Sequence, residues 1–115
     1  MASTPTRVPV VLYVSTTSAQ SCERFLEGAR RYAECRDWDV IAALYDLYGL
    51  NRDGARPAWQ QARDLIDSRQ AAGIVTRYQT MVTSHGDAHT LQAWLAERGA
   101  WLACTWQGQL QLATT

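Results

Sequence analysis

The sequence predicts a three-layer α/β domain, in which helices cover both faces of a mostly parallel sheet of four to five strands. Short apolar runs rich in β-branched residues alternate along the chain with segments whose apolar residues recur every three to four positions. The polar, Gly- and Pro-containing stretches between them are short. Repeated strand-helix order with right-handed crossovers gives a parallel sheet with helices on both sides.

Length and composition favour one soluble domain over residues 1–115, with 1–6 and 113–115 expected to be flexible. A chain of 115 residues can bury one core, and its 47% apolar content argues against disorder. No apolar run approaches the ~20 residues that span a bilayer. The first residues lack a basic segment followed by a long apolar core, so we expect no secretory signal, no membrane contact and a cytoplasmic location.

The charges are balanced, with eleven basic residues, all of them Arg, and eleven acids. Binding to duplex DNA needs clustered positive charge, so any DNA binding is expected to be weak. Cys22, Cys35 and Cys104 lack the spacing of a metal site and are expected to be free thiols. His85 and His89 lie one helical turn apart without an evident third ligand. We therefore expect no metal and no other cofactor.

The first predicted strand, Val8 to Val14, runs into four consecutive hydroxyl residues: Ser15, Thr16, Thr17 and Ser18. Apolar positions with helical spacing follow and predict a helix that ends near Arg36. Thr17 and Gln20 have the spacing of a capping box, which places the start of this helix at Thr17.

Trp38 to Asp46 is an almost continuous apolar run, which is typical of a parallel strand buried on both faces. Residues 47–56 have the composition of a loop. Pro57 suits the first turn of a second helix. The inner face of that helix is expected to contain Trp59, Ala62, Leu65 and Ile66.

The second half of the chain continues the alternation. Gly73 to Arg77 predicts the third strand, and the pattern of Tyr78 to Ser84 is ambiguous. A third helix is expected to begin near Ser84 and to end at Gly99. Ala100 to Trp106 predicts the fourth strand, after which Gly108 could turn the chain into a short antiparallel edge strand.

The hydroxyl loop has two interpretations. Ligands collect at the carboxyl ends of parallel strands, where the next helix presents free N–H groups, so Ser15, Thr16, Thr17 and Ser18 could bind a phosphate or another anion. Ser and Thr are also the preferred residues at helix caps. We favour capping and keep the anion site as the alternative.

Several strings, taken in order, resemble the catalytic domain of the serine recombinases, the resolvase and invertase family. The resemblance covers about residues 7–105. It rests on the Ser-Thr string with Gln20, on Ala29 to Val40, on Asp46 followed ten residues later by Arg56-Pro57, and on Ala96 to Gly99. It implies a domain in which a serine hydroxyl attacks a DNA phosphodiester, with arginines around the phosphate and no metal.

The same resemblance leaves the nucleophile open. The position falls on Thr16 if Gln20 occupies the family's glutamine position, whereas the local wording favours Ser15. In either alignment the arginine expected two residues earlier is replaced, by Val14 or Tyr13.

Other family positions also depart from the pattern, although Arg56 is retained. Leu50 stands where the family has a second serine, and Gln79, Thr80 and Thr83 stand where it has an acid and two arginines. The pentavalent transition state gathers negative charge, so losing several cations should abolish phosphoryl transfer.

We therefore expect a recombinase-like domain with a degenerate active site that acts as a protein interaction or regulatory module. Two alternatives stay open. The domain could be a residual DNA recombinase with a serine nucleophile, or it could bind a small phosphate-containing ligand as flavodoxin-like proteins do.

The sequence also predicts self-association. The segment Gln107 to Ala113 has no Lys, Pro or acid that would discourage edge pairing. We expect a homodimer whose interface includes Trp106, Leu110 and Leu112.

Overall fold

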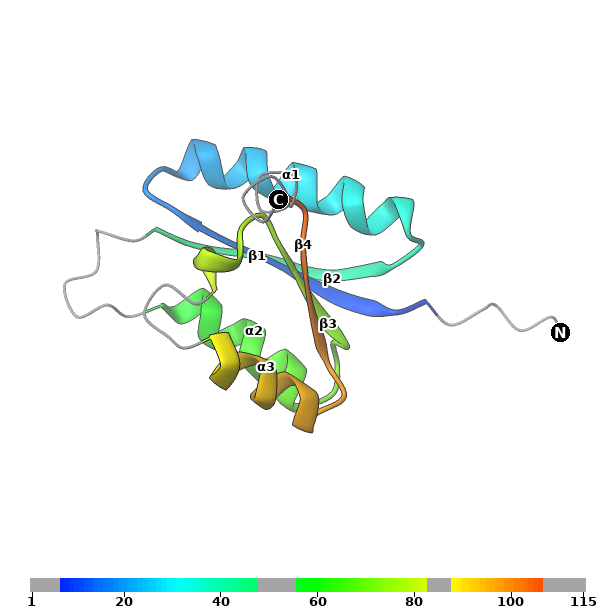
Figure 1. Ribbon diagram of the computed structural model, residues 1–115. Coiled ribbons are helices and arrows are strands. Elements are labelled where there is room, and N and C mark those ends of the chain that lie inside the picture. The colour runs from blue at the N-terminus through cyan, green and yellow to red at the C-terminus, as the bar shows by residue number, and fades with distance from the viewer. Residues whose placement is uncertain (1–6, 48–55, 83–87, 107–115) are drawn as a thin grey trace, which may run out of the picture.

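A parallel sheet of four strands forms the middle layer of the domain (Figure 1). The computed structural model describes residues 7–47, 56–82 and 88–106. Within them the strands are β1 (Pro9–Thr16), β2 (Asp39–Leu47), β3 (Gly73–Thr76) and β4 (Trp101–Cys104), arranged in the order β2-β1-β3-β4. All three neighbouring pairs are parallel.

Helices cover both faces of this sheet (Figure 1). Helix α1 (Ala19–Cys35) lies on one face, and α2 (Pro57–Asp67) and α3 (Ala88–Glu97) lie on the other. A short 3₁₀ turn, η1 (Gln79–Met81), follows β3. The predicted three-layer α/β fold class is confirmed. The proposed fifth strand falls on residues 107–113, which lie outside the described residues.

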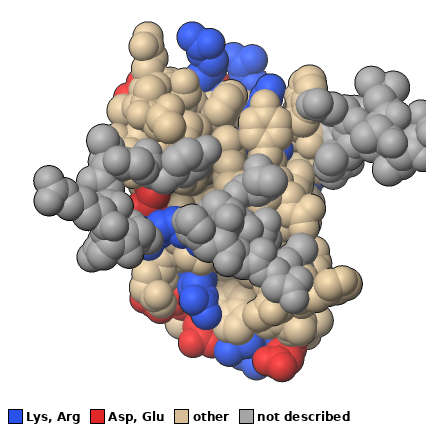
Figure 2. Space-filling model, turned by 60° about the vertical axis from the view of Figure 1, so that its left-hand side comes forward, with Lys and Arg blue, Asp and Glu red and all other residues tan. Residues whose placement is uncertain are grey.

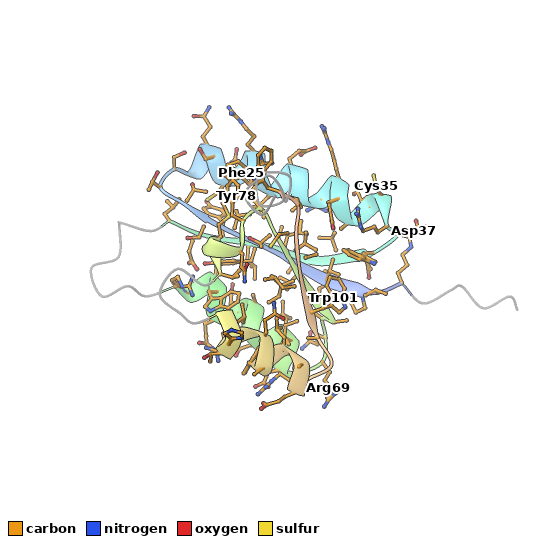
Figure 3. All side chains as sticks on the ribbon, viewed as in Figure 1. Phe25, Cys35, Asp37, Arg69, Tyr78 and Trp101 are labelled. Atoms are coloured by element: carbon orange, nitrogen blue, oxygen red, sulfur yellow. The ribbon has the colours of Figure 1, made fainter. Side chains whose placement is uncertain are left out.

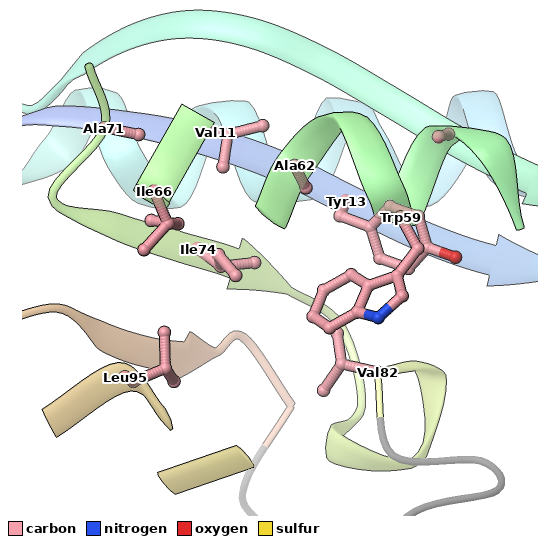
Figure 4. Close-up of a cluster of buried hydrophobic side chains, with 10 residues drawn as sticks. Val11, Tyr13, Trp59, Ala62, Ile66, Ala71, Ile74, Val82 and Leu95 are labelled. Carbon is pink, nitrogen blue, oxygen red and sulfur yellow. The ribbon is translucent and has the colours of Figure 1, made fainter. Parts of the chain in front are cut away.

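The alternation of side chains along β1 divides the core between the two faces. Val10 and Leu12 pack against Ala29 and Ala33 of α1. The opposite face holds a larger cluster around α2, shown in Figure 4: Val11, Tyr13, Ala58, Trp59, Ala62, Ile66, Ala71, Ile74, Val82 and Leu95. Because α1 covers one side of β1 and α2 covers the other, both faces of this strand are buried.

The prediction that β2 is buried on both faces is wrong. β2 is an edge strand, and along it exposed and partly buried residues alternate from Asp39 to Tyr45. Ile41 and Tyr45 are 38% and 40% exposed. The apolar run identified a strand correctly, but strand order decides which strand has an open side.

The helix boundaries agree with the sequence at most ends. α1 ends at Cys35, α2 begins at Pro57, and Gly99 follows α3 with a φ of 66°. The predicted cap of α1 is wrong by one residue, because Ser18 rather than Thr17 is the N-cap and its side chain accepts from Ser21 N. Among the described helices, none has the length and hydropathy to cross a bilayer.

Candidate functional site

The carboxyl ends of β1 and β2 lie together where the sequence predicts a site, and β3 ends a few residues earlier along β1. Ser15 and Thr16 of β1 pair with Asp46 and Leu47 of β2, and β3 ends at Thr76 beside β1. Ser15 and Asp46 are therefore direct neighbours on adjacent strands. The resemblance matches Asp46 to the acid on the second strand of the recombinases, and in this chain Asp46 lies beside Ser15.

The carboxylate of Asp46 is buried and accepts three hydrogen bonds. Its Oδ2 accepts from Tyr13 Oη at 2.9 Å and from Trp59 N at 2.9 Å, and its Oδ1 accepts from Ala58 N at 3.1 Å. The first N–H groups of a helix have no partner within the helix, and Pro57 has no N–H. Asp46 therefore caps α2 from a neighbouring strand.

Tyr13 stands at one of the two positions where the family resemblance implies an arginine. Burial raises the pKa of its phenol far above the ordinary value, the hydrogen bond and negative charge of Asp46 raise it further, and the nearby charge of Arg56 opposes them. Tyr13 is thus a neutral donor to Asp46 at physiological pH. A guanidinium at this position would have been a permanent cation.

Ser15 lies on the same face of β1 as Tyr13, two residues further along the strand. Ser15 is 1% exposed, and among the described residues its Oγ makes no hydrogen bond of regular geometry. Ser15 nevertheless interacts with the Tyr13 phenol, because hydrogen bonding by Ser15 opposes the rise in the pKa of that phenol. The hydroxyl is therefore buried in the described structure.

Arg56 is the one family arginine that the sequence retains, and the structure places it near this site. It immediately precedes α2, and its Nη1 donates to Met81 O at 3.1 Å. Its guanidinium lies 5.3 Å from the ring centroid of Trp59. Its positive charge opposes the rise in the pKa of the Tyr13 phenol.

The hydroxyl loop behaves as a cap in the described structure. Thr16 Oγ1 accepts from Ser18 N at 3.0 Å and donates to Ser18 O at 2.8 Å, and Ser18 Oγ accepts from Ser21 N at 3.0 Å. Thr17 and Gln20 are exposed. Two of the four hydroxyls are thus bound to the backbone, and anion binding by Ser15, Thr16, Thr17 and Ser18 stays a prediction.

Arg77 lies on the opposite side of the sheet, among aromatic rings that sequence reasoning did not bring together. Its guanidinium is 4.9 Å from the ring centroid of Phe25 on α1, 5.4 Å from that of Tyr78 and 5.0 Å from that of Trp106. Figure 3 shows Phe25 and Tyr78 close together above the sheet, with ring centroids 6.0 Å apart. Arg77 therefore packs on the α1 side, whereas Tyr13 and Asp46 lie on the α2 side.

The remaining candidates are placed only in part. Trp106 is 38% exposed and makes an edge-to-face contact with Tyr78, while Leu110, Leu112, Leu50 and His85 lie outside the described residues. Gln79 belongs to η1. Within the described residues, no group of three or more His, Cys, Asp or Glu side chains could hold a metal.

No protein-family model and no curated protein sequence matches the chain. Solved structures of serine recombinase domains do. The C-terminal catalytic domain of ISC1926 TnpA, an IS607-like serine recombinase, is 18% identical with a TM-score of 0.75, covering 93% of this chain and 76% of that one. The corresponding domain of IS1535 TnpA is 23% identical with a TM-score of 0.64, covering 84% and 70%.

A serine recombinase from Sulfolobus solfataricus is 16% identical with a TM-score of 0.60, covering 91% of this chain and 76% of that one. The chain therefore has a serine recombinase-like fold, and the fold that the resemblance implied is confirmed. At these identities the likeness concerns the fold, so the site has to be judged on its own residues.

Proposed function

We propose that this domain keeps a recombinase-like fold without phosphoryl transfer and acts as a protein interaction or regulatory module linked to DNA recombination. The observation that carries the proposal is the burial of Ser15, which is 1% exposed and pairs with Asp46 on the neighbouring strand. A phosphodiester could reach this hydroxyl only if the end of the sheet opened.

Among the described residues, those around Ser15 offer little of what such chemistry needs. A serine nucleophile needs a proton acceptor, and the buried carboxylate beside it, that of Asp46, already accepts three hydrogen bonds. Developing charge on the phosphate needs fixed cations, and removing one such donor typically costs ~100-fold or more in rate. Tyr13 supplies no charge, which leaves Arg56 as the retained cation near the site.

The charge distribution supports a protein partner over DNA. The net charge is zero, and Figure 2 shows arginines on the displayed face in separate groups, some with acidic side chains beside them. Duplex binding scales with the number of phosphates that are neutralised, so we expect little affinity at physiological salt. The partner would be another protein or a second copy of this chain, acting in the cytoplasm.

The test is a search for a covalent link between the protein and DNA. The full chain is incubated with supercoiled DNA carrying candidate recombination sites, quenched with denaturant and examined by gel and mass spectrometry. An active serine recombinase with its own site is the positive control. We expect no adduct and no relaxed or nicked DNA.

Ser15→Ala and Thr16→Ala variants make a positive result interpretable. An adduct formed by the wild-type protein and lost in either variant contradicts the proposal. It would establish the alternative, a residual recombinase with a serine or threonine nucleophile.

A further inference from the structure

The outer side of β2 is an open sheet edge in the part of the chain that the structure describes. β2 is nine residues long and pairs only with β1. An open edge presents unpaired N–H and C=O groups, which proteins usually protect with charges, Pro or bulges. Here the segment Val40 to Tyr45 contains neither a charge nor a Pro. It does contain a bulge-like register shift, because Val40 pairs with Val10 and Ala42 with Val11, which leaves Ile41 as an extra residue without a partner on β1.

The side chains along this edge are apolar on both faces of the sheet. Ile41, Ala43 and Tyr45 are exposed, and Ile41 and Tyr45 are two of the four large apolar residues exposed in the described chain. On the α2 side, Ala42, Leu44 and Leu65 form the apolar part of a groove of about 440 Å³, whose other lining residues are polar: Gln61, Asp64, Ser68 and Gln70. A strand added at this edge would therefore cover apolar surface above and below the sheet.

We propose that β2 pairs antiparallel with β2 of a second copy, about a two-fold axis at Ala43. This inference deepens the proposed function by naming its partner as a second copy of the chain. In this register Ile41 lies opposite Tyr45 of the other copy, and Ala42 lies opposite Leu44. The pairing extends one four-stranded sheet into the next and closes with two-fold symmetry, so it forms a dimer rather than a fibre.

Self-complementarity is the argument for a second copy. Opposite residues of an antiparallel pair lie on the same face, so the axis must pass through a residue rather than between two. With the axis at Ala43, each Tyr45 lies opposite Ile41 of the other copy, which gives two pairs of an aromatic and a β-branched residue on one face. On the other face each Leu44 lies opposite the small Ala42 of the other copy. Such cross-strand pairs contribute about 0.2–1 kcal/mol each. The small-large pairs direct Leu44 toward the groove beside Ala42 of the other copy.

Other axes fit less well. An axis at Ala43 places Asp46 opposite Val40, three residues from the axis and outside residues 41–45 that carry the pairing. An axis at Leu44 places Asp46 opposite Ala42, and an axis at Tyr45 places it opposite Leu44, so Asp46, whose carboxylate is buried and committed to α2, then lies closer to the centre of the pairing. Two copies with zero net charge also have no overall repulsion to overcome.

The oligomeric state of the full chain is the first test. Sedimentation equilibrium at 10–100 µM, on the order of the affinity expected for a small interface, should show a dimer. Ala43→Lys places two like charges directly opposite each other and should give a monomer with an unchanged circular dichroism spectrum. Ala93→Lys, the same change at an exposed position of α3, should leave the dimer intact.

Two results would overturn the inference. One is a wild-type monomer throughout this range. The other is a dimer that persists in Ala43→Lys, which moves the interface to another surface such as that around Trp106. Both measurements are independent of the DNA adduct assay. The proposal that the domain lacks phosphoryl transfer and the proposal that it dimerises through β2 can therefore be refuted separately.

Cysteine cross-linking tests the register. The exposed Cys35 is first replaced by Ser, because it could form its own intermolecular disulfide. In that background Ala43→Cys should cross-link to itself under mild oxidation, since residue 43 faces its own copy across the axis. Tyr45→Cys should not, because residue 45 faces residue 41. Cross-linking at 45 without cross-linking at 43 rules the register out.

Discussion

Asp46 joins three parts of the domain through one carboxylate. It accepts from Tyr13 on the neighbouring strand and from the N–H groups of Ala58 and Trp59 at the start of α2. The helix dipole favours negative charge at this end of α2, and two of the three donors are orphan N–H groups of the helix. Tyr13 supplies the remaining donor, so the residue standing at an arginine position has a structural role here.

The Tyr13–Asp46 contact makes stability fall at high pH. Burial first, and then Asp46, raise the pKa of Tyr13 in the folded state above its value of about 10 in the unfolded chain. The folded state therefore holds the phenolic proton more tightly. The stabilisation is fully present below pH of about 10 and is lost as the pH rises further, by up to about 1.4 kcal/mol per pH unit.

We predict that the free energy of unfolding, measured with urea between pH 8 and 11, falls more steeply for the wild type than for Tyr13→Phe. At pH 8 the variant should be less stable by about 1–3 kcal/mol, because the buried carboxylate loses one donor. Tyr45→Phe, at an exposed position, is the matched control and should follow the wild type. Equal slopes for all three proteins would show that Tyr13 ionises as freely in the folded state as in the unfolded chain.

At the scale of the elements, the contact between β3 and β4 depends on a missing side chain. Gly73 pairs with Trp101, and a Cβ added at Gly73 would lie 2.5 Å from three atoms of the indole. The Trp101 indole also packs against that of Trp38, with ring centroids 4.6 Å apart (Trp101 is labelled in Figure 3). A shift of the indole away from a new Cβ would disturb this contact.

Gly73→Ala should lower the free energy of unfolding by about 1–3 kcal/mol through overpacking. Gly28→Ala is the matched control, since nothing lies within 4 Å of its Cβ position in α1. That change should raise stability by about 0.5–1 kcal/mol, because Ala favours the helix. Chemical denaturation measures both, and a Gly73→Ala protein as stable as the wild type would mean that Trp101 moves freely.

Over the whole molecule, sequence patterns predicted the features that depend on neighbours along the chain. The apolar run after Val8, the helix start at Pro57 and the helix end at Gly99 all have local causes, and each is confirmed. The edge position of β2 was missed because the order of the strands within the sheet cannot be inferred from the composition of each strand.

The site was predicted only in its location, for the same reason. The hydrogen bond between Tyr13 and Asp46 joins residues 33 positions apart, and no local sequence pattern indicates it. The cap at Ser18 was missed by one residue because four hydroxyl residues in a row offer several equivalent caps. The fold persists at 18% identity because it depends on apolar periodicity, whereas phosphoryl transfer depends on a few polar side chains.

Thiol reactivity measures directly whether position 15 can be reached in the folded protein. Ser15→Cys is made with Cys35 and Cys104 replaced by Ser, which leaves Cys22 as the buried internal reference. Ser18→Cys in the same background is the exposed control from the same loop. The rate of reaction with a soluble disulfide reagent is followed in native buffer and again in denaturant.

We expect Cys at position 15 to react as slowly as Cys22 in native buffer and to become reactive only on unfolding. Cys at position 18 should react rapidly in native buffer. If position 15 is modified in native buffer at a rate near that of position 18, Ser15 is accessible in the folded protein and the proposed loss of phosphoryl transfer is contradicted.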